Sequence, residues 1–340
     1  MNRRLNVAIV GVTGAVGQTL LTVLQERQFP VETLYPLASA RSVEKTVMFY
    51  GQELDVLDLA DFDFSGVDIA LFSAGGSVSK EYAPKAAAAG CVVIDNTSCF
   101  RYDDDVPLVV PEVNAHKIAE FTHRNIIANP NCSTIQMLVA LKPLHDAAGI
   151  HRINVATYQA VSGTGNKAIS ELIHQLGELL NGRPIKAEVY PEQIAFNVLP
   201  HIDQFEENGY TREEMKMVWE THKIMEDDTI LVNPTAVRVP VLYGHSEAIH
   251  LELRSPLTVA KARKILQGAP GVKLVDNPAK NGYPTPIKNA AGHDEVYVGR
   301  IRQDISHPCG LDLWVVADNI RKGAATNAVQ IAEILYQDYL

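Results

Sequence analysis

The feature that most constrains the fold is a buried strand, a glycine-rich turn and a helix in direct succession near the N-terminus. Leu5 to Val10 are continuously apolar, as in a parallel strand that is covered on both faces. Gly11 to Gly17 (GVTGAVG) follow, and leucines then recur at helical spacing. This order is typical of the phosphate-binding unit of a Rossmann domain, in which glycines let the backbone approach a pyrophosphate at the helix N-terminus. The spacing is GxxGxxG rather than GxGxxG, so a simple tight turn is the alternative.

Further apolar strands continue this pattern. We expect strands over 67–73 and 91–94, with an alanine-rich helix from Tyr82 to Ala89 between them. Ligands approach an open α/β sheet at the carboxyl ends of its strands. The small residues that follow the first of these strands therefore predict a second wall of the cofactor cleft, made by Ser73, Gly75 and Gly76.

The end of the second predicted strand, 34–37, indicates which dinucleotide is preferred. Sites that prefer NAD usually place a carboxylate here for the ribose 2′-hydroxyl, but this chain has none before Glu44. Arg41, with Ser39 and Ser42 beside it, can instead donate hydrogen bonds to a 2′-phosphate. The sequence thus predicts NADP rather than NAD, and a solvated loop arginine is the alternative.

A candidate nucleophile lies at Cys132, within Asn129 to Thr134 (NPNCST). A short buried strand, 125–128, precedes this turn, and apolar residues at helical spacing follow it. Unpaired N–H groups and the helix dipole favour a thiolate at a helix N-terminus, where Asn131 or Ser133 could serve as N-cap. The structural alternative is a small buried residue in a turn.

Composition limits the remaining classes. The chain has 340 residues, 46% of them hydrophobic and 21% charged, as expected for a soluble globular protein of one large or two smaller domains. We expect no membrane span, no signal peptide and, from the net charge of −10, no nucleic-acid partner. The four cysteines lack zinc-ligand or disulfide spacing, which predicts no metal and a reducing, cytoplasmic setting.

Two later segments could support chemistry at Cys132. Gln159, near the end of a predicted strand that opens onto a glycine turn, could orient a substrate carbonyl or carboxylate; a solvated strand glutamine is the alternative. Glu213 and Lys216 lie three residues apart on one helix face, where an ion pair that stabilises the helix is the default interpretation.

Arg238 and His245 form the last candidate pair. Arg238 lies in an apolar alternating strand, so it forms either a buried salt bridge or a clamp for a substrate carboxylate. His245 follows a turn at Gly244 and could act as an acid or base near neutral pH, although a lone histidine is usually structural.

Taken together, these motifs resemble the aspartate-β-semialdehyde dehydrogenase family over the whole chain. The resemblance rests on the glycine turn, NPNCST around Cys132, the segment around Gln159, Arg238 through His245, and the stretch leading to Asn319. It implies NADPH-dependent reductive dephosphorylation of L-aspartyl-4-phosphate to L-aspartate 4-semialdehyde and phosphate, through an acyl thioester on the cysteine. This reaction belongs to lysine, threonine, methionine and diaminopimelate biosynthesis.

The resemblance also implies a role for each site residue. Cys132 would be the nucleophile, His245 the acid or base, and Gln159 the group that positions the acyl intermediate. The substrate-binding residues would be Arg238 for the α-carboxylate, Glu213 for the ammonium group, and Arg101 and Lys216 for the phosphate. The cofactor-binding residues would be Gly11, Thr13, Gly14, Ala15, Val16, Ser39, Arg41, Ser42, Ser73, Gly75, Gly76, Ser162, Gly163 and Asn319.

We therefore expect an α/β protein with a Rossmann-like NADP-binding domain over residues 1–128. A mixed α/β catalytic and dimerisation domain would span 129–319, and a C-terminal helix within 320–340 would return to pack on the first domain. The resemblance implies a homodimer. Two other functions remain open: an N-acetyl-γ-glutamyl-phosphate reductase-like enzyme, and a catalytically silent paralogue, which should have lost residues that this chain keeps.

Overall fold

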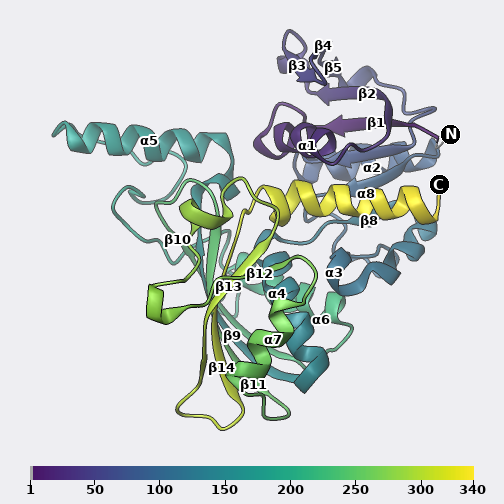
Figure 1. Cartoon of the computed structure of the whole chain (residues 1–340). Coiled ribbons are helices and arrows are strands. Elements are labelled where there is room, and N and C mark those ends of the chain that lie inside the picture. The colour runs from purple at the N-terminus through teal and green to yellow at the C-terminus, as the bar shows by residue number, and fades with distance from the viewer. Residues whose placement is uncertain (1–2) are drawn as a thin grey trace. The chain divides into compact units, whose positions relative to one another are not determined.

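The computed structural model describes residues 3–340, which divide into two compact units (Figure 1). The first unit contains residues up to Asn131 together with Ala324–Leu340, and the second is Cys132–Gly323. The division falls between Asn131 and Cys132, three residues beyond the position expected from the sequence.

A six-stranded parallel sheet forms the centre of the first unit, in the order β5-β2-β1-β6-β7-β8. Its order reverses between β1 and β6, which is where ligands bind in folds of this kind. A small antiparallel pair, β3 and β4, lies outside this sheet. The strands are β1 (Leu5–Val10), β2 (Val31–Ala38), β3 (Thr46–Phe49), β4 (Gln52–Asp55), β5 (Leu57–Asp58), β6 (Ile69–Phe72), β7 (Val92–Asp95) and β8 (Ile126–Ala128).

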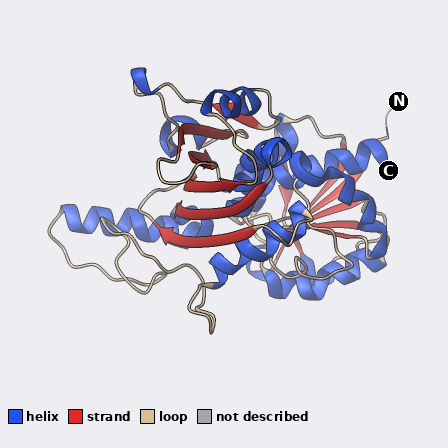
Figure 2. Cartoon of the chain, turned by 90° about the horizontal axis from the view of Figure 1, so that it is seen from below, coloured by secondary structure: helices blue, strands red, loops and turns tan. Residues whose placement is uncertain are grey.

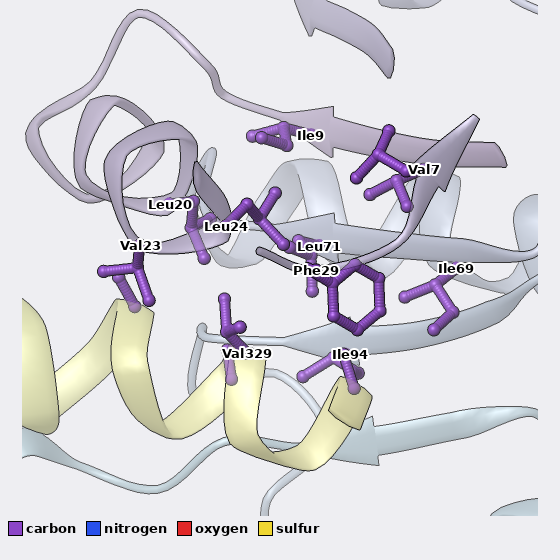
Figure 3. Close-up of a cluster of buried hydrophobic side chains, with 14 of the residues drawn as sticks. Val7, Ile9, Leu20, Val23, Leu24, Phe29, Ile69, Leu71, Ile94 and Val329 are labelled. Atoms are coloured by element: carbon purple, nitrogen blue, oxygen red, sulfur yellow. The ribbon is translucent and has the colours of Figure 1, made fainter. Parts of the chain in front are cut away.

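Helices cover both faces of this parallel sheet, which is why its central strands are apolar throughout. Helices α1 (Ala15–Glu26) and α8 (Thr326–Asp338) pack together on one face, and α2 (Gly76–Ala88) packs on the other. Figure 2 shows helices on both sides of these strands. Figure 3 shows Leu20, Val23 and Leu24 of α1 pointing toward Val329 of α8 in one buried cluster. The short helix α3 (Pro111–Asn114) also contacts α8. The C-terminal segment thus completes the core of the N-terminal unit.

Helix α2 differs from its predicted extent. It begins at Gly76 rather than at Tyr82, with Gly75 as its N-cap residue at a φ of 101°. The prediction of a helix from Tyr82 to Ala89 was wrong at its start, because Gly75, Gly76 and Ser77 were interpreted as loop. Glycine is the residue that adopts this positive φ at little steric cost, so the helix starts directly after it.

The second unit contains a mixed six-stranded sheet in the order β10-β9-β11-β14-β13-β12. Its strands are β9 (Ile150–Gln159), β10 (Leu231–Arg238), β11 (His245–Leu253), β12 (Val272–Leu274), β13 (Val296–Gln303) and β14 (Gly310–Ala317). Helices α4 (Cys132–Ala148), α6 (Arg212–Met225) and α7 (Val259–Gln267) pack against it, and α5 (Asn166–Leu180) packs on the short 3₁₀ turn η4 (Val161–Thr164).

The two faces of this mixed sheet differ in burial. Along β9, Ile153, Val155 and Thr157 are buried, whereas Asn154 and Ala156 are only partly buried and Tyr158 is exposed. Alternate strand residues point to opposite faces, so the helices cover one face and leave the other accessible within this chain.

Candidate functional site

The first unit has a cavity of about 600 Å³ at the point where the strand order reverses. Gly11 and Ser73, at the ends of β1 and β6, both line it. A Cβ atom on Gly11 would lie 2.9 Å from the backbone of Ala74, and its φ is +89°. Only glycine satisfies both conditions, so the two loops can approach each other at the floor of the cavity.

Some of the predicted cofactor residues line this cavity. They are Gly11, Thr13, Gly14, Ser39 and Ser73. Ala15 and Val16 form the first turn of α1, whose N-cap residue Gly14 makes no side-chain hydrogen bond and whose first turn has no acidic residue. The N–H groups and positive dipole end of α1 are therefore suited to an anion.

The remaining predicted cofactor residues of this unit lie outside the cavity lining. Arg41 and Ser42 are in a short 3₁₀ turn after β2, where Arg41 is exposed and forms no ion pair with a described residue. Gly75 and Gly76 form the start of α2. Sequence reasoning missed Asp58, Leu59, Ala60 and Tyr82, which do line the cavity. Asp58 is the last residue of the two-residue strand β5, and Leu59 and Ala60 follow it directly. This strand is too short to give a periodic signal.

Arg101 lies in the loop that follows β7. Its guanidinium is buried and donates to the carbonyl oxygen of Asn96 at 2.8 Å. The same loop is anchored by Asp95, whose buried carboxylate accepts hydrogen bonds from Ser79 and Thr97. Burial raises the pKa of Asp95, against the opposing effects of these hydrogen bonds and of Arg101. Arg101 is thus a buried cation held by an ordered loop.

Asn129 fixes the turn that precedes the candidate nucleophile. Its amide nitrogen donates to Asn96 Oδ1 at 2.9 Å, and its oxygen accepts from Asn327 of α8 at 2.7 Å. All three side chains belong to the first unit. This network explains why the turn has a defined geometry.

The second unit contains the remaining predicted residues. Cys132 is the first residue of α4, as predicted, and is partly exposed. Gly323 packs directly against it, since a Cβ atom on Gly323 would lie 2.8 Å from Cys132 Cβ. One turn further along α4, the buried Gln136 donates to the carbonyl oxygen of His245 at 3.4 Å. The start of α4 and the start of β11 therefore lie together.

Gln159, Arg238 and His245 meet at one edge of the mixed sheet. Gln159 and Arg238 are paired last residues of β9 and β10, and His245 begins the neighbouring strand β11. All three are almost fully buried. The interpretation of Gln159 as a solvated residue was therefore wrong, because α6 covers its side chain, which donates to Glu213 at 3.1 Å.

Arg238 forms no salt bridge with a described carboxylate, so the interpretation as a structural ion pair was also wrong. Its Nη1 donates to the carbonyl oxygen of Ala160 at 2.7 Å, and its guanidinium carbon lies 5.9 Å from the Tyr190 ring centroid. Its Nε has no hydrogen-bond partner among residues 3–340. A buried cation with unused donors is suited to an anionic ligand.

Glu213 and Lys216 form the ion pair that helical spacing predicts, at 3.1 Å. Lys216 also forms an ion pair with Asp203 at 2.8 Å. Asp203 lies in an irregular segment, and the sequence did not predict it as a partner. Burial disfavours the charged amine, but Glu213 and Asp203 outweigh this effect and raise the pKa of Lys216. The amine is therefore a permanent cation within a group of charges.

His245 is completely buried, and its Nδ1 accepts the Ala160 N–H at 3.0 Å. Burial first, and the Arg238 charge second, lower the pKa of His245 to about 3, against the opposing effect of Glu213. A Cβ atom on Gly163 would lie 3.4 Å from His245 Nε2 and 3.1 Å from Arg238 Nη1. Glycine at 163 thus leaves open space beside both groups.

Ser162 and Asn319, both predicted cofactor residues, bond each other in the second unit. The Asn319 amide nitrogen donates to Ser162 Oγ at 3.0 Å, and its oxygen accepts the Gly244 N–H at 2.9 Å. The segment directly after β14 therefore fixes both η4 and the turn before His245.

Glu247 is a buried carboxyl group that the sequence analysis did not select. It lies two residues after His245 and on the same strand face, and burial raises its pKa well above its ordinary value. The Gln136 amide opposes this shift, but neither carboxyl oxygen has a full hydrogen bond to a described residue. Its spacing of two from His245 along a strand is the signal that could have indicated it.

Among the described residues, no cluster of His, Cys, Asp and Glu side chains could hold a metal ion. No helix within residues 3–340 is both long and apolar enough to cross a bilayer.

The Rossmann-like unit and the mixed-sheet unit with a cysteine at a helix N-terminus define a class, the nicotinamide dinucleotide-dependent oxidoreductases.

Comparison with known proteins narrows this class to one family. Residues 6–121 match the model described as semialdehyde dehydrogenase, NAD binding domain, and residues 141–322 match semialdehyde dehydrogenase, dimerisation domain. An aspartate-semialdehyde dehydrogenase of Legionella pneumophila is 76% identical over 340 residues, which are 100% of this chain and 98% of that protein. The chain therefore belongs to the aspartate-semialdehyde dehydrogenase family, and it is an enzyme of amino-acid biosynthesis.

Solved structures agree with this assignment. The crystal structure of aspartate semialdehyde dehydrogenase II from Vibrio cholerae, complexed with ASA, is 60% identical with a TM-score of 0.98 and covers 99% of this chain and 100% of its own. The Candida albicans enzyme with NADP is 25% identical with a TM-score of 0.75 and covers 98% of each chain. The predicted family and fold class are confirmed, and the cofactor is a nicotinamide dinucleotide.

Proposed function

We propose that this enzyme uses NADPH to convert L-aspartyl-4-phosphate to L-aspartate 4-semialdehyde and phosphate, in the synthesis of lysine, threonine and methionine. The observation that carries the proposal is the arrangement in the second unit. Gln159, Arg238 and His245 converge at one sheet edge, and Gln136 ties the start of β11 to the helix that Cys132 begins. The Vibrio cholerae relative, whose structure is complexed with ASA, supports the substrate.

The first unit fits a dinucleotide. The cavity of about 600 Å³ lies beside an α1 N-terminus without a side-chain cap, which suits a pyrophosphate. Arg41, with Ser39 and Ser42, would hold the 2′-phosphate that distinguishes NADP from NAD, as the Candida albicans complex with NADP supports. When bound, the nicotinamide would supply the hydride that reduces the acyl group.

Cations explain how an acidic protein would bind a substrate that carries a carboxylate and a phosphate. Arg238 would hold the α-carboxylate, because its buried guanidinium has donors that no described carboxylate occupies. Glu213 would face the ammonium group. Lys216 and Arg101 would bind the phosphate, which requires Lys216 to share its charge between the phosphate and its two carboxylate partners.

Cys132 would attack the acyl phosphate and form a thioester, with phosphate as the leaving group. The positive end of the α4 dipole stabilises negative charge on its Sγ. Gln159, whose amide is already oriented by Glu213 and Thr157, would position the acyl group. His245 would serve as the acid or base for the same group through Nε2.

The open face of the mixed sheet supports a homodimer. It has a cavity of about 620 Å³ near Asn154, His250 and Trp314, and it belongs to the segment that matches a dimerisation domain. A second copy would cover these partly buried strand residues. A reducing, cytoplasmic location would suit an enzyme whose nucleophile must remain a free thiol.

The deciding experiment is the reverse reaction, the phosphate-dependent reduction of NADP by aspartate semialdehyde. We expect turnover in the wild type and none in Cys132→Ala, which should still bind NADPH. Cys309→Ala is the matched control, since Cys309 is also a partly exposed thiol. It lies just before β14, whereas Asn319 lies just after the other end of that strand. Near-normal activity in Cys132→Ala would refute the thioester. Turnover of N-acetylglutamate semialdehyde instead would identify the reductase of the longer substrate.

A further inference from the structure

Arg238 ends the edge strand of the mixed sheet, so few elements are available to fix its side chain. It is the last residue of β10, which pairs with β9 on one side only. On the other side, Leu199 forms an isolated antiparallel bridge with Arg238. Two backbone hydrogen bonds, of 2.9 and 2.8 Å, join these two residues. The segment that contains Leu199 therefore covers the sheet edge at Arg238.

The Arg238 guanidinium is restrained on two sides. Its Nη1 donates to the carbonyl oxygen of Ala160 at 2.7 Å, and its carbon lies 5.9 Å from the Tyr190 ring centroid. Neither Nε nor Nη2 donates a hydrogen bond to a described residue. These two nitrogens form one edge of the planar group, and two parallel N–H donors match the geometry of a carboxylate. The direction in which this edge points therefore decides whether Arg238 can hold a substrate carboxylate.

Tyr190 is itself fixed beside the guanidinium. Its hydroxyl donates to Thr164 Oγ1 at 3.1 Å, and Thr164 is the last residue of η4. Its ring is buried in a small apolar cluster with Val161, Ala168, Leu172, Ile194, Ala195 and Leu199. An aromatic ring attracts a cation that lies near its face, and a ring that cannot move also limits the rotation of that cation.

Two buried side chains of α5 hold the backbone on both sides of Tyr190. Glu171 accepts the two N–H groups of residues 188–189, at 2.9 and 2.5 Å. Gln175, one turn later, accepts the two N–H groups of residues 194–195, both at 3.1 Å. The Gln175 amide also donates to Glu171 at 3.3 Å. Figure 1 shows α5 well away from the helices that pack on the mixed sheet, and these contacts give it a defined task.

We infer that Tyr190 is a positioning residue for substrate binding: its ring holds the Arg238 guanidinium so that the Nε–Nη2 edge faces the substrate carboxylate. Glu171 and Gln175 of α5 brace the segment that carries the ring. The inference deepens the proposed function and rests on it for the identity of the carboxylate. An arginine that is already fixed loses less conformational entropy on binding, so the benefit falls on substrate affinity rather than on the chemical step.

The first test observes the guanidinium in the free enzyme. The full-length protein is labelled with ¹⁵N-arginine, and the Arg238 Nε signal is identified by its absence in Arg238→Lys. A buried N–H exchanges with water only when its surroundings open, so we expect slow exchange in the wild type and in Tyr190→Phe, which keeps the ring. Exchange should be about tenfold faster in Tyr190→Leu. Equal exchange rates in the three proteins would overturn the inference, whatever the substrate is.

The second test measures Michaelis constants in the phosphate-dependent reduction of NADP by aspartate semialdehyde. In Tyr190→Leu we expect KM for the semialdehyde to rise about tenfold, as loss of a buried cation–π contact implies. Neither kcat nor the KM for phosphate should change by more than about twofold, because the ring acts on the carboxylate clamp alone. Tyr190→Phe should keep the KM for the semialdehyde within about threefold of the wild-type value, since the ring remains.

Glu171→Gln tests the brace from α5, because a neutral amide oxygen accepts weaker hydrogen bonds than a carboxylate does. Glu178→Gln is the matched control on the same helix, where the carboxylate pairs with the exposed Arg183 at 3.4 Å. Only Glu171→Gln should raise the KM for the semialdehyde. An unchanged KM in Tyr190→Leu, or equal rises in KM for semialdehyde, phosphate and NADP, would show a packing role alone and overturn the inference. Absence of turnover in the wild type would instead refute the proposed function, and the exchange rates would then decide the role of Tyr190.

Discussion

Replacing Gly17 with alanine tests how closely α1 packs on the phosphate-binding turn. A Cβ atom at this position would lie 2.3 Å from the carbonyl oxygen of Gly11 and 2.7 Å from Val12 Cα. Both are backbone atoms of the turn, so no side-chain rotation can relieve the overlap. Overpacking of this kind typically costs ~1–3 kcal/mol, and the better helix propensity of alanine recovers at most ~1 kcal/mol.

We therefore expect Gly17→Ala to lower the free energy of unfolding by about 2 kcal/mol in urea titrations followed by circular dichroism. Because relief of the overlap must move the turn, NADPH affinity should also fall, about tenfold for each 1.4 kcal/mol of lost interaction. Dissociation constants measured by the fluorescence of NADPH provide this second readout.

Gly177→Ala is the matched control. Gly177 also lies inside a helix, α5, but a Cβ atom there would meet nothing within 4 Å. The same chemical change should leave stability unchanged or raise it by up to ~1 kcal/mol, with NADPH binding unaffected. If Gly17→Ala matched this control in both measurements, the close-packing argument would be refuted.

Three further predictions follow from the two units. Arg41→Ala should weaken NADPH far more than NADH in equilibrium binding, and equal losses would contradict a role at the 2′-phosphate. In Gly323→Ala the added Cβ atom would lie 2.8 Å from Cys132 Cβ, so the thiol should be displaced. We expect kcat to fall by ~10²-fold with an unchanged NADPH dissociation constant. A kcat within twofold of that of the wild type would exclude a displaced thiol. Burial raises the pKa of Glu247 above the ordinary value of 4.5, so its contribution to stability is fully present below that pH and declines as the pH rises. Glutamine does not titrate, so the free energy of unfolding of Glu247→Gln should rise relative to that of the wild type as the pH increases from about 4 to 8. Urea unfolding at several pH values measures this difference. If the two proteins showed the same pH dependence, the carboxyl group would not be buried as described.

Much of the first unit, and the place of Cys132 at a helix start, could be predicted from local sequence. The order of strand, glycine turn and helix determined β1 and α1, because apolar periodicity and glycine conformation act over a few residues. The same reasoning predicted that Cys132 lies at the start of a helix, which the structure confirms. The start of α2 was missed because a glycine N-cap has no periodic signal.

The tertiary structure decided the state of each polar side chain. Sequence alone left Gln159 and Arg238 with structural alternatives, and these were removed only when burial and partners became visible. Asp203 and Glu247 were not predicted from the sequence. Asp203 pairs with Lys216, and Glu247 is a buried carboxyl group with a raised pKa. The Nδ1 atom of His245 accepts a hydrogen bond from the backbone N–H of Ala160, a residue 85 positions away in sequence. The sequence thus determined which chemical groups the chain has and where its local elements begin. The protonation and availability of those groups depend on long-range burial and electrostatics, which only the packed sheet and helices establish.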